Sequence, residues 1–438
     1  MLSAISSCWA LLLGISFLLL GSGLQSSLLG IRASLEGFAT VVTGLIMSGY
    51  YVGFVAGSMV APRLVARVGH VRVFAALAAL ASTTVLLHAV LVEPVTWTAL
   101  RLATGFCYAG LYVVTESWLN ARADNAMRGQ LLAVYVALCL IGMALGQLLL
   151  NLADPGGVEL FVLVSVLVSL GVVPMLLSTG PTPAHEAPVK VCLKHLLSIS
   201  PLGVLGLFGT VLVHGAFFGM GPVYAAEAGL SVREISLFMS AMLLGGIVLQ
   251  WPVGWLSDAF DRRKVIALAT LLAAGFAITA GMASGGPEAG FLVAVALFGG
   301  MALPMYSLCL AHANDYLRPE EMVAASGSLI LMASFGAALG PVSASAAMAL
   351  FGPPAFFWWL AAIHGAIGVF ALWRMTRRAA PAPEAQGAFI AMPPRATPAA
   401  TALYAEAASG PGSAAHEAGE STQPRTEGEL MPRGERAS

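Results

Sequence analysis

The chain has 438 residues, of which 58% are hydrophobic and only 10% are charged, and its formal net charge is −1. Soluble domains carry about 25% charged residues, so most of this chain's surface cannot face water. A chain without a basic surplus also lacks the charge that neutralises nucleic-acid phosphates, and we expect no nucleic acid as a partner. The composition therefore predicts a membrane protein embedded in a lipid bilayer.

Twelve stretches reach the roughly 20 apolar residues that a membrane-spanning helix needs. The first stretch is preceded by a flank without positive charge and followed by no clear cleavage site, so we interpret it as a helix and not as a signal peptide. We predict an all-α membrane protein with 12 transmembrane helices at residues 8–30, 38–61, 73–92, 96–120, 130–152, 158–178, 201–225, 234–254, 264–284, 289–313, 322–350 and 355–375.

The longest internal connection, residues 179–200, contains several prolines and separates six predicted helices from six. We therefore predict an N-terminal half (1–178), a cytoplasmic linker (179–200) and a C-terminal half (201–377). The remainder, 378–438, is rich in Ala, Pro, Gly, Glu and Ser and cannot bury an apolar core, which predicts a disordered cytoplasmic tail.

Basic residues gather in the loops on one side of the predicted bundle. With the N-terminus inside, the other side holds only Arg32, Arg101 and Arg233. By the positive-inside rule, both termini are predicted to be cytoplasmic.

The two halves resemble each other in sequence. Residues 46–53 match residues 238–245, and residues 142–146 match residues 336–340, at nearly constant spacing. Two six-helix pseudo-repeats along one chain are typical of secondary transporters, whose site lies between the halves near the middle of the membrane. Small residues four apart let helices approach closely, and we expect the glycines at 142, 146, 336 and 340 to form contacts between the halves.

No GxxxxGK[ST] phosphate loop, HExxH or GxSxG sequence is present, so the motifs of nucleotide-driven pumps and common intramembrane hydrolases are missing. The five cysteines form no CxxC pair, and we interpret them as small apolar residues. We expect a protein that is not an enzyme and that binds neither a cofactor nor a metal.

The run Gly254–Arg263 (GWLSDAFDRR) resembles the loop motif of the major facilitator superfamily (MFS), and Arg101-x-x-x-Gly105 resembles the fourth-helix motif of that family. The runs Glu116–Asn120 and Ala311–Asp315 resemble its YcaD-like branch of bacterial members. The resemblance covers about residues 1–378. It implies the MFS fold, alternating access, a central cavity lined by the first, fourth, seventh and tenth helices, and a multi-pass protein of the bacterial inner membrane.

The resemblance also implies a gate at the cytoplasmic face. Asp258 is expected to cap the fifth helix and pair with Arg128, with a solvated loop carboxylate as the alternative. The earlier copy of the loop departs from the family with Pro62 and Ala66, so Arg63 or Arg67 is expected to pair with Glu320 or Glu321 instead. The predicted gate consists of Arg67, Gly69, Arg128, Gly254, Asp258, Asp261, Arg262 and Arg263.

Polar side chains follow one face of the predicted fourth helix, and ionisable residues inside a membrane are functional candidates. Glu116 is interpreted either as the carrier of a coupling proton or as a structural partner of Arg122 or Arg128. Arg101 either contacts the solute or a gate, or it packs against a neighbouring helix or extends to the interface. His214 is either a neutral, hydrogen-bonded imidazole or one that titrates or contacts the solute. The candidate cavity residues are Gln25, Arg101, Tyr108, Tyr112, His214 and Tyr306.

These features predict a monomeric secondary active transporter that moves a small-molecule, organic solute by alternating access. We expect coupling to protons or another ion, with export favoured by the resemblance alone. The alternative is a non-transporting membrane sensor or scaffold that keeps the fold and uses its tail.

Overall fold

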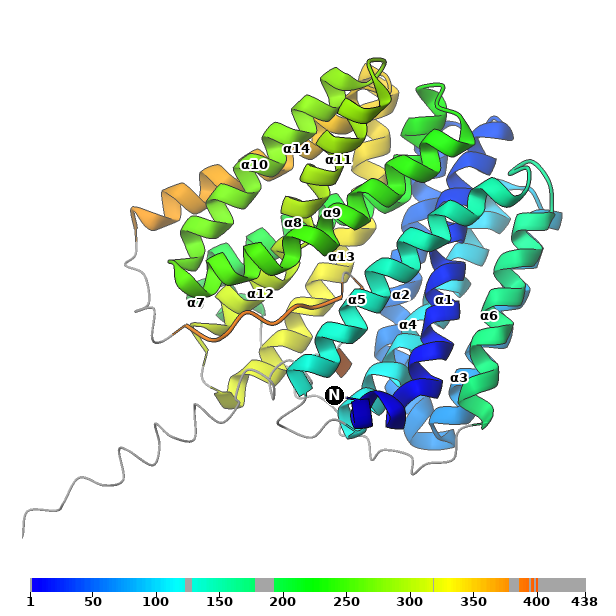
Figure 1. Cartoon of the computed structure of the whole chain (residues 1–438), viewed down its shortest axis with the longest axis horizontal. Helices are drawn as coiled ribbons and strands as arrows, with labels where there is room; N and C mark the ends of the chain where they lie inside the picture. Colours follow the sequence, from blue (N-terminus) through cyan, green and yellow to red (C-terminus); the bar gives the residue numbers. More distant parts are fainter. Residues whose placement is uncertain are drawn as a thin grey trace, which may run out of the picture.

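The computed structural model describes residues 2–122, 128–177, 193–317, 319–377, 386–393, 395–397 and 399–400. Within these ranges, the description is limited to the backbone for residues 2–8, 122, 128–129, 319–320, 323–324 and 326. The described part is helical and forms two bundles that lie side by side (Figure 1).

The helices of the first bundle are α1 (Leu2–Leu35), α2 (Thr40–Val68), α3 (His70–Val90), α4 (Pro94–Arg122), α5 (Arg128–Leu148), the short η1 (Leu149–Leu152) and α6 (Glu159–Leu177). A short helix, α7 (Leu193–Ile199), lies in the predicted linker. The second bundle contains α8 (Pro201–Glu227), α9 (Val232–Ala259), α10 (Arg262–Ala283), α11 (Glu288–Ala302), α12 (Met305–Asn314), α13 (Pro319–Phe351) and α14 (Ala355–Met375).

The predicted all-α fold is confirmed, with one helix interrupted. The tenth predicted helix breaks at Leu303 and Pro304 into α11 and α12, because proline cannot supply the backbone N–H that a continuous helix needs. Within the described ranges, eleven helical stretches are long and apolar enough to cross a membrane, with α11 and α12 counted together. The remaining long helix, α4, has 29 residues and carries Arg101 and Glu116.

Both bundles contain the same close contact between two of their helices. A Cβ atom on Gly53 of α2 would collide with the carbonyl oxygen of Leu102 in α4, and one on Gly245 of α9 would collide with that of Ala296 in α11. Glycine at these matched positions lets the two backbones touch. The reciprocal contacts are Gly105 against Tyr50 and Gly299 against Met242.

The expectation that Gly146 and Gly340 form contacts between the two halves was wrong. A Cβ atom on Gly146 of α5 would collide with Leu20 of α1, and one on Gly340 of α13 would collide with Leu212 of α8. Both contacts therefore lie inside a single half, because α5 packs on α1 and α13 packs on α8.

The halves touch each other near one end of the bundle. We call the end at which α1 begins and α2 ends the N-terminal face, and the other end the opposite face. The direct contacts run between α2 and α13, α5 and α9, and α1 and α8. Hydrogen bonds near the opposite face join Thr40 to Glu227 (2.6 Å), Ser48 to the Ala338 carbonyl (2.5 Å), Asn151 to Ser236 (2.8 Å) and Ser240 to the Ala144 carbonyl (3.1 Å).

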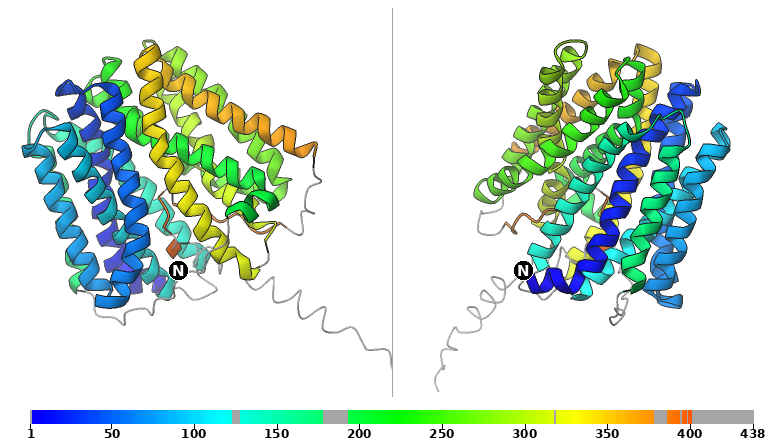
Figure 2. Two further views of the ribbon diagram at one scale, coloured as in Figure 1. Left: turned by 180° about the vertical axis from the view of Figure 1, so that it is seen from behind. Right: turned by 45° about the vertical axis from the view of Figure 1, so that its right-hand side comes forward.

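Residues 386–400, which we call the C-terminal segment, depart from the predicted disorder in the part that the structure describes. The segment follows α14 and runs back between the two bundles (Figure 2). Met392, Ala396, Thr397 and Ala400 are buried there. The physical reason is local, since the apolar run 389–392 covers helix surfaces and the neighbouring polar groups find partners. The rest of the predicted tail lies outside the described residues.

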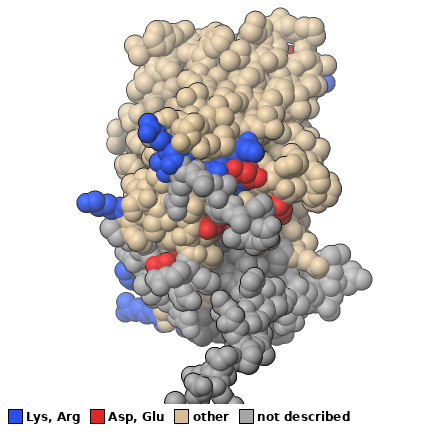
Figure 3. All heavy atoms as spheres, turned by 90° about the vertical axis from the view of Figure 1, so that its left-hand side faces the viewer, with Lys and Arg blue, Asp and Glu red and all other residues tan. Residues whose placement is uncertain are grey.

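Figure 3 shows the side of the molecule that lies at the left of Figure 1. Lysine, arginine, aspartate and glutamate side chains gather in the middle and lower part of the view, whereas the upper surface is almost free of charge. A broad uncharged surface is what contact with lipid requires.

Candidate functional site

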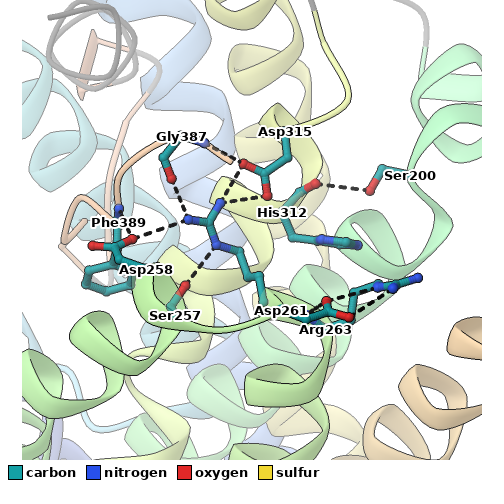
Figure 4. Close-up of polar contacts among 10 residues, drawn as sticks. Ser200, Ser257, Asp258, Asp261, Arg263, His312, Asp315, Gly387 and Phe389 are labelled. Atoms are coloured by element: carbon teal, nitrogen blue, oxygen red, sulfur yellow. Dashed lines mark hydrogen bonds and ion pairs between the residues drawn. The ribbon is translucent and has the colours of Figure 1, made fainter. Parts of the chain in front are cut away.

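A buried ion pair joins the start of α10 to the end of α12. Arg262 Nη1 donates to both carboxylate oxygens of Asp315 at 2.6 and 2.7 Å, and the two side chains are 1% and 2% exposed. Arg262 also donates from Nε to Ser257 and from Nη2 to the carbonyl of Gly387. The guanidinium thus ties the second half to the C-terminal segment, and the surrounding contacts are drawn in Figure 4.

Sequence reasoning placed Arg262 in the gate but missed its partner. The available signal was the acidic Asp315 at the end of the run Ala311–Asp315, an ionisable side chain beside an apolar helix. Burial raises the pKa of the Asp315 carboxyl, although Arg262 acts in the opposite direction.

Asp258 also faces the C-terminal segment. Its Oδ1 accepts a 2.7 Å hydrogen bond from the backbone N–H of Phe389, and Arg262 Nη2 lies 3.5 Å from the same oxygen. A Cβ atom on Gly254 would lie 2.5 Å from the ring of Phe389. The expected pairing with Arg128 falls on a side chain outside the described residues. The run Gly254–Arg263 therefore contacts residues 387–389 of the C-terminal segment.

Asp261 and Arg263 form a local pair at the start of α10. Asp261 accepts hydrogen bonds from the Arg263 backbone N–H at 3.0 Å and from its Nη2 at 2.9 Å, so it caps the helix. Partial burial acts to raise the pKa of Asp261, but the hydrogen bonds and charge of Arg263 outweigh it and hold that pKa below its ordinary value.

The earlier loop copy is arranged differently. Gly69 separates α2 from α3 with a φ of 89°, a left-handed backbone that favours glycine. Arg67 is exposed, and Arg63 donates to the carbonyl of Met59 in its own helix at 2.9 Å. The side chain of Glu320 lies outside the described residues.

A cavity lies between the two halves, and its empty volume of about 480 Å³ includes space that is open to solvent. It is lined from α2, α8, α12, α13 and the C-terminal segment. Two predicted residues, His214 and Tyr306, line it. The lining residues that sequence reasoning missed include Tyr50, Tyr51, Phe54, Phe218 and Arg395.

The polar face of α4 points into the protein, as predicted. The Arg101 guanidinium lies 4.6 Å from the centre of the Tyr50 ring, a distance at which a cation is attracted to an aromatic face. The hydroxyls of Tyr108 and Tyr112 and the amide nitrogen of Gln25 are buried, without a hydrogen-bond partner among the described residues. Such groups are available to a polar solute.

Glu116 is fully buried in α4. Its carboxylate accepts hydrogen bonds from the Tyr135 hydroxyl at 3.3 Å and from the Thr397 backbone N–H at 3.2 Å, and also from the Thr397 hydroxyl. The basic partners considered from sequence, Arg122 and Arg128, have side chains outside the described residues. The described partners of Glu116 therefore include a neutral tyrosine and the C-terminal segment.

His214 of α8 faces the break between α11 and α12. Its Nε2 lies 3.1 Å from the carbonyl oxygen of Ala302 and donates to it, since a carbonyl can only accept. The other ring nitrogen, Nδ1, is buried without a partner among the described residues. His214 therefore presents one acceptor atom in the wall of the cavity.

Comparison with known proteins identifies the architecture. The family model described as Major Facilitator Superfamily matches residues 11–233 and 204–408. Two relatives, each called uncharacterized MFS-type transporter YcaD, come from Escherichia fergusonii and Salmonella arizonae. Each is 26% identical over 333 residues, which cover 76% of this chain and 86% of the relative.

Solved structures share the fold at low identity. The nucleoside transporter NupG has a TM-score of 0.64 at 14% identity, over 84% of this chain and 97% of its own. A bacterial homolog of the human lysosomal transporter Spinster, in an inward-facing and occupied conformation, has a TM-score of 0.65 at 14% identity, over 84% and 94%. The Escherichia coli fucose:proton symporter FucP has a TM-score of 0.52 at 17% identity, over 83% and 98%.

Proposed function

The chain belongs to the Major Facilitator Superfamily, and from this premise we propose that this membrane solute transporter exports a small organic molecule by proton-coupled alternating access. The observation that carries the proposal is the cavity between the halves, together with direct hydrogen bonds near the opposite face. A cavity at the interface of two repeats is where a rocking transporter binds its solute.

Alternating access also needs a gate at the N-terminal face. Arg67, Gly69, Arg128, Gly254, Asp258, Asp261, Arg262 and Arg263 form it in this proposal. That face is cytoplasmic, both termini lie on it, and the transporter works as a monomer in a bacterial inner membrane. The proposal is supported by the concentration of basic residues in the loops of this side.

Proton coupling is assigned to Glu116. A carboxylate inside the bundle is costly unless its oxygens accept hydrogen bonds, so its charge depends on its surroundings. Tyr135 donates one such bond. In the proposed cycle, Glu116 carries a proton in one conformation and releases it in the other, where donors reach its oxygens.

The test begins with solutes that raise the melting temperature of the purified protein, because a ligand of the folded state stabilises it by mass action. Those solutes are then followed in proteoliposomes. Glu116→Gln is expected to lose at least tenfold of the uptake driven by a pH gradient and to keep counterflow exchange. The control is Glu159→Gln, since Glu159 is exposed at the start of α6. Loss of both activities in Glu116→Gln would assign this residue a structural role.

A further inference from the structure

The C-terminal segment contacts both halves at groups that line the proposed transport path. At the N-terminal face, the N–H of Gly387 donates to Asp315 at 3.1 Å and its carbonyl accepts from Arg262 at 2.5 Å. Two residues further on, Phe389 lies against Gly254 and donates to Asp258. The entrance groups of the second half therefore hold the start of the segment.

The segment then passes the cavity, where Arg395 lies among aromatic rings and hydroxyls of both halves. Its Nη1 donates to the hydroxyls of Ser22 at 2.9 Å and Tyr50 at 3.4 Å. The guanidinium carbon lies 5.2 Å from the centre of the Tyr50 ring and 5.7 Å from that of Phe218. Two aromatic faces within about 6 Å form a site that attracts a cation.

Two further contacts fix the depth of the segment. The N–H of Met392 donates to Ser307 of α12 at 2.9 Å. Thr397 donates from its backbone and its hydroxyl to Glu116. The segment therefore uses both the aromatic cation site and the buried carboxylate that the proposed mechanism needs.

We propose that the C-terminal segment is a tethered substrate mimic that fills the transport path, and that the natural solute is a small organic cation with a guanidinium or amino group. The proposal rests on the proposed function, because a mimic needs a transported solute to imitate. Arg395 takes the place of the cationic group, and Thr397 takes the place of the solute's donor to Glu116.

The contacts fit an occupant that can be displaced. Arg101 lies against the same Tyr50 ring, so its like charge weakens the hold on Arg395. A short tether gives an effective concentration on the order of millimolar. A free cation at comparable concentration therefore competes with the segment, and solute binding releases the path.

Cavity accessibility tests the proposal without any flux measurement. Ser334 and Arg395 line the same cavity, so Ser334→Cys is labelled with a water-soluble maleimide in a background whose five native cysteines are replaced by alanine. Deleting residues 386–438 is expected to raise the labelling rate at least tenfold. Deleting only 401–438 is the matched control and is expected to leave the rate unchanged. Equal labelling rates in the two deletion variants would overturn the proposal that the C-terminal segment fills the transport path.

Charge recognition is tested in two ways. In the full chain, Arg395→Gln is expected to raise the labelling rate and Arg395→Lys to leave it near the original value. In the protein lacking 386–438, n-butylguanidinium is expected to slow labelling at least threefold, whereas the uncharged isostere n-butylurea has no effect. Equal protection by the two compounds, or by neither, would overturn the assignment of a cationic solute. Absent flux with intact protection would count against the transport function and not against the binding site.

Discussion

At the opposite face the two halves touch through their own helices, whereas at the N-terminal face the described C-terminal segment lies between them. The first kind of contact joins residues such as Ser240 and Ala144 directly. The second passes through the C-terminal segment, which belongs to neither bundle: Gly387 and Phe389 donate to the second half, and Arg395 and Thr397 donate to the first half. Closure at the opposite face is therefore a property of the helices, while closure at the N-terminal face depends on a separate piece of chain.

The stabilising interactions at the two faces also differ: hydrogen bonds between helices at the opposite face, and a buried ion pair at the N-terminal face. Hydrogen bonds between helices in a membrane contribute about 0.6 kcal/mol each on average, so the opposite face can open at modest cost. The N-terminal face contains the buried pair of Arg262 and Asp315, whose disruption leaves an uncompensated charge. The pair joins α10 to α12 within the second half, so the proposed rocking motion breaks the former contacts and leaves the pair intact.

The largest expected effect is at the buried ion pair. Arg262→Met leaves the Asp315 carboxylate without its bidentate partner and is expected to cost about 3–5 kcal/mol of stability. The melting temperature in detergent measures this loss. The double variant Arg262→Met with Asp315→Asn should be more stable than Arg262→Met alone, because no charge is then left unpaired.

A surface pair supplies the control for that prediction. Arg233 Nη1 lies 3.9 Å from Glu288 Oε2, and the two side chains are 71% and 41% exposed, so Arg233→Met is expected to cost only about 0–1 kcal/mol. If Arg262→Met melted no earlier than Arg233→Met, the pair at Asp315 would not be the anchor of the N-terminal face.

A smaller effect is expected at the opposite face, where α2 meets α13. A Cβ atom on Gly44 would lie 2.6 Å from the Cβ of Ser345 and 2.9 Å from the carbonyl oxygen of Pro341. Gly44→Ala therefore overfills this contact and is expected to cost about 1–3 kcal/mol. Melting temperatures measure the change, and Ser345→Gly should restore part of the loss in the double variant.

Gly275 of α10 is the matched control for Gly44, because a Cβ atom there meets nothing within 4 Å. Gly275→Ala is expected to leave the melting temperature unchanged or slightly higher, since alanine is the better helix former. Equal losses in both variants would mean that the spacing of the halves at Gly44 is not critical.

Much of the fold was predictable because its causes are local. Apolar length predicts the long helices, and Gly53, Gly105, Gly245 and Gly299 repeat because two backbones can touch only where no Cβ intervenes. The break before α12 was missed although Pro304 marks it. A proline in an apolar run can also lie in a continuous, kinked helix, so the signal did not decide between the two.

The candidate site was predictable only in part. The spacing of Tyr108, Tyr112 and Glu116 identifies one face of a helix, because charge and hydroxyls contrast with an apolar background. Phe218 has no such contrast, since an aromatic residue in an apolar helix looks the same in a core and in a cavity. Arg395 lies in a stretch whose composition predicts disorder, and its contacts depend on two bundles that meet only after folding.

The smallest effect distinguishes the two ends most directly. Ser240→Ala removes one hydrogen bond between the halves, from the Ser240 hydroxyl to the Ala144 carbonyl at 3.1 Å. The Ala144 carbonyl remains part of the backbone of α5. A loss of about 0.6 kcal/mol shifts the balance between open and closed forms of the opposite face about threefold. The matched control is Ser343→Ala, because Ser343 donates within α13 to Leu339 at 2.8 Å.

The readout is labelling of Ser334→Cys by an impermeant maleimide added at the opposite face of sealed vesicles. Ser240→Ala is expected to raise this rate about threefold and Ser343→Ala to leave it unchanged. A rise confined to Ser240→Ala would assign closure of this face to direct contact between the halves. A similar rise in both variants would instead show a general loosening of the helices, and the contrast between the two faces would then lose its physical basis.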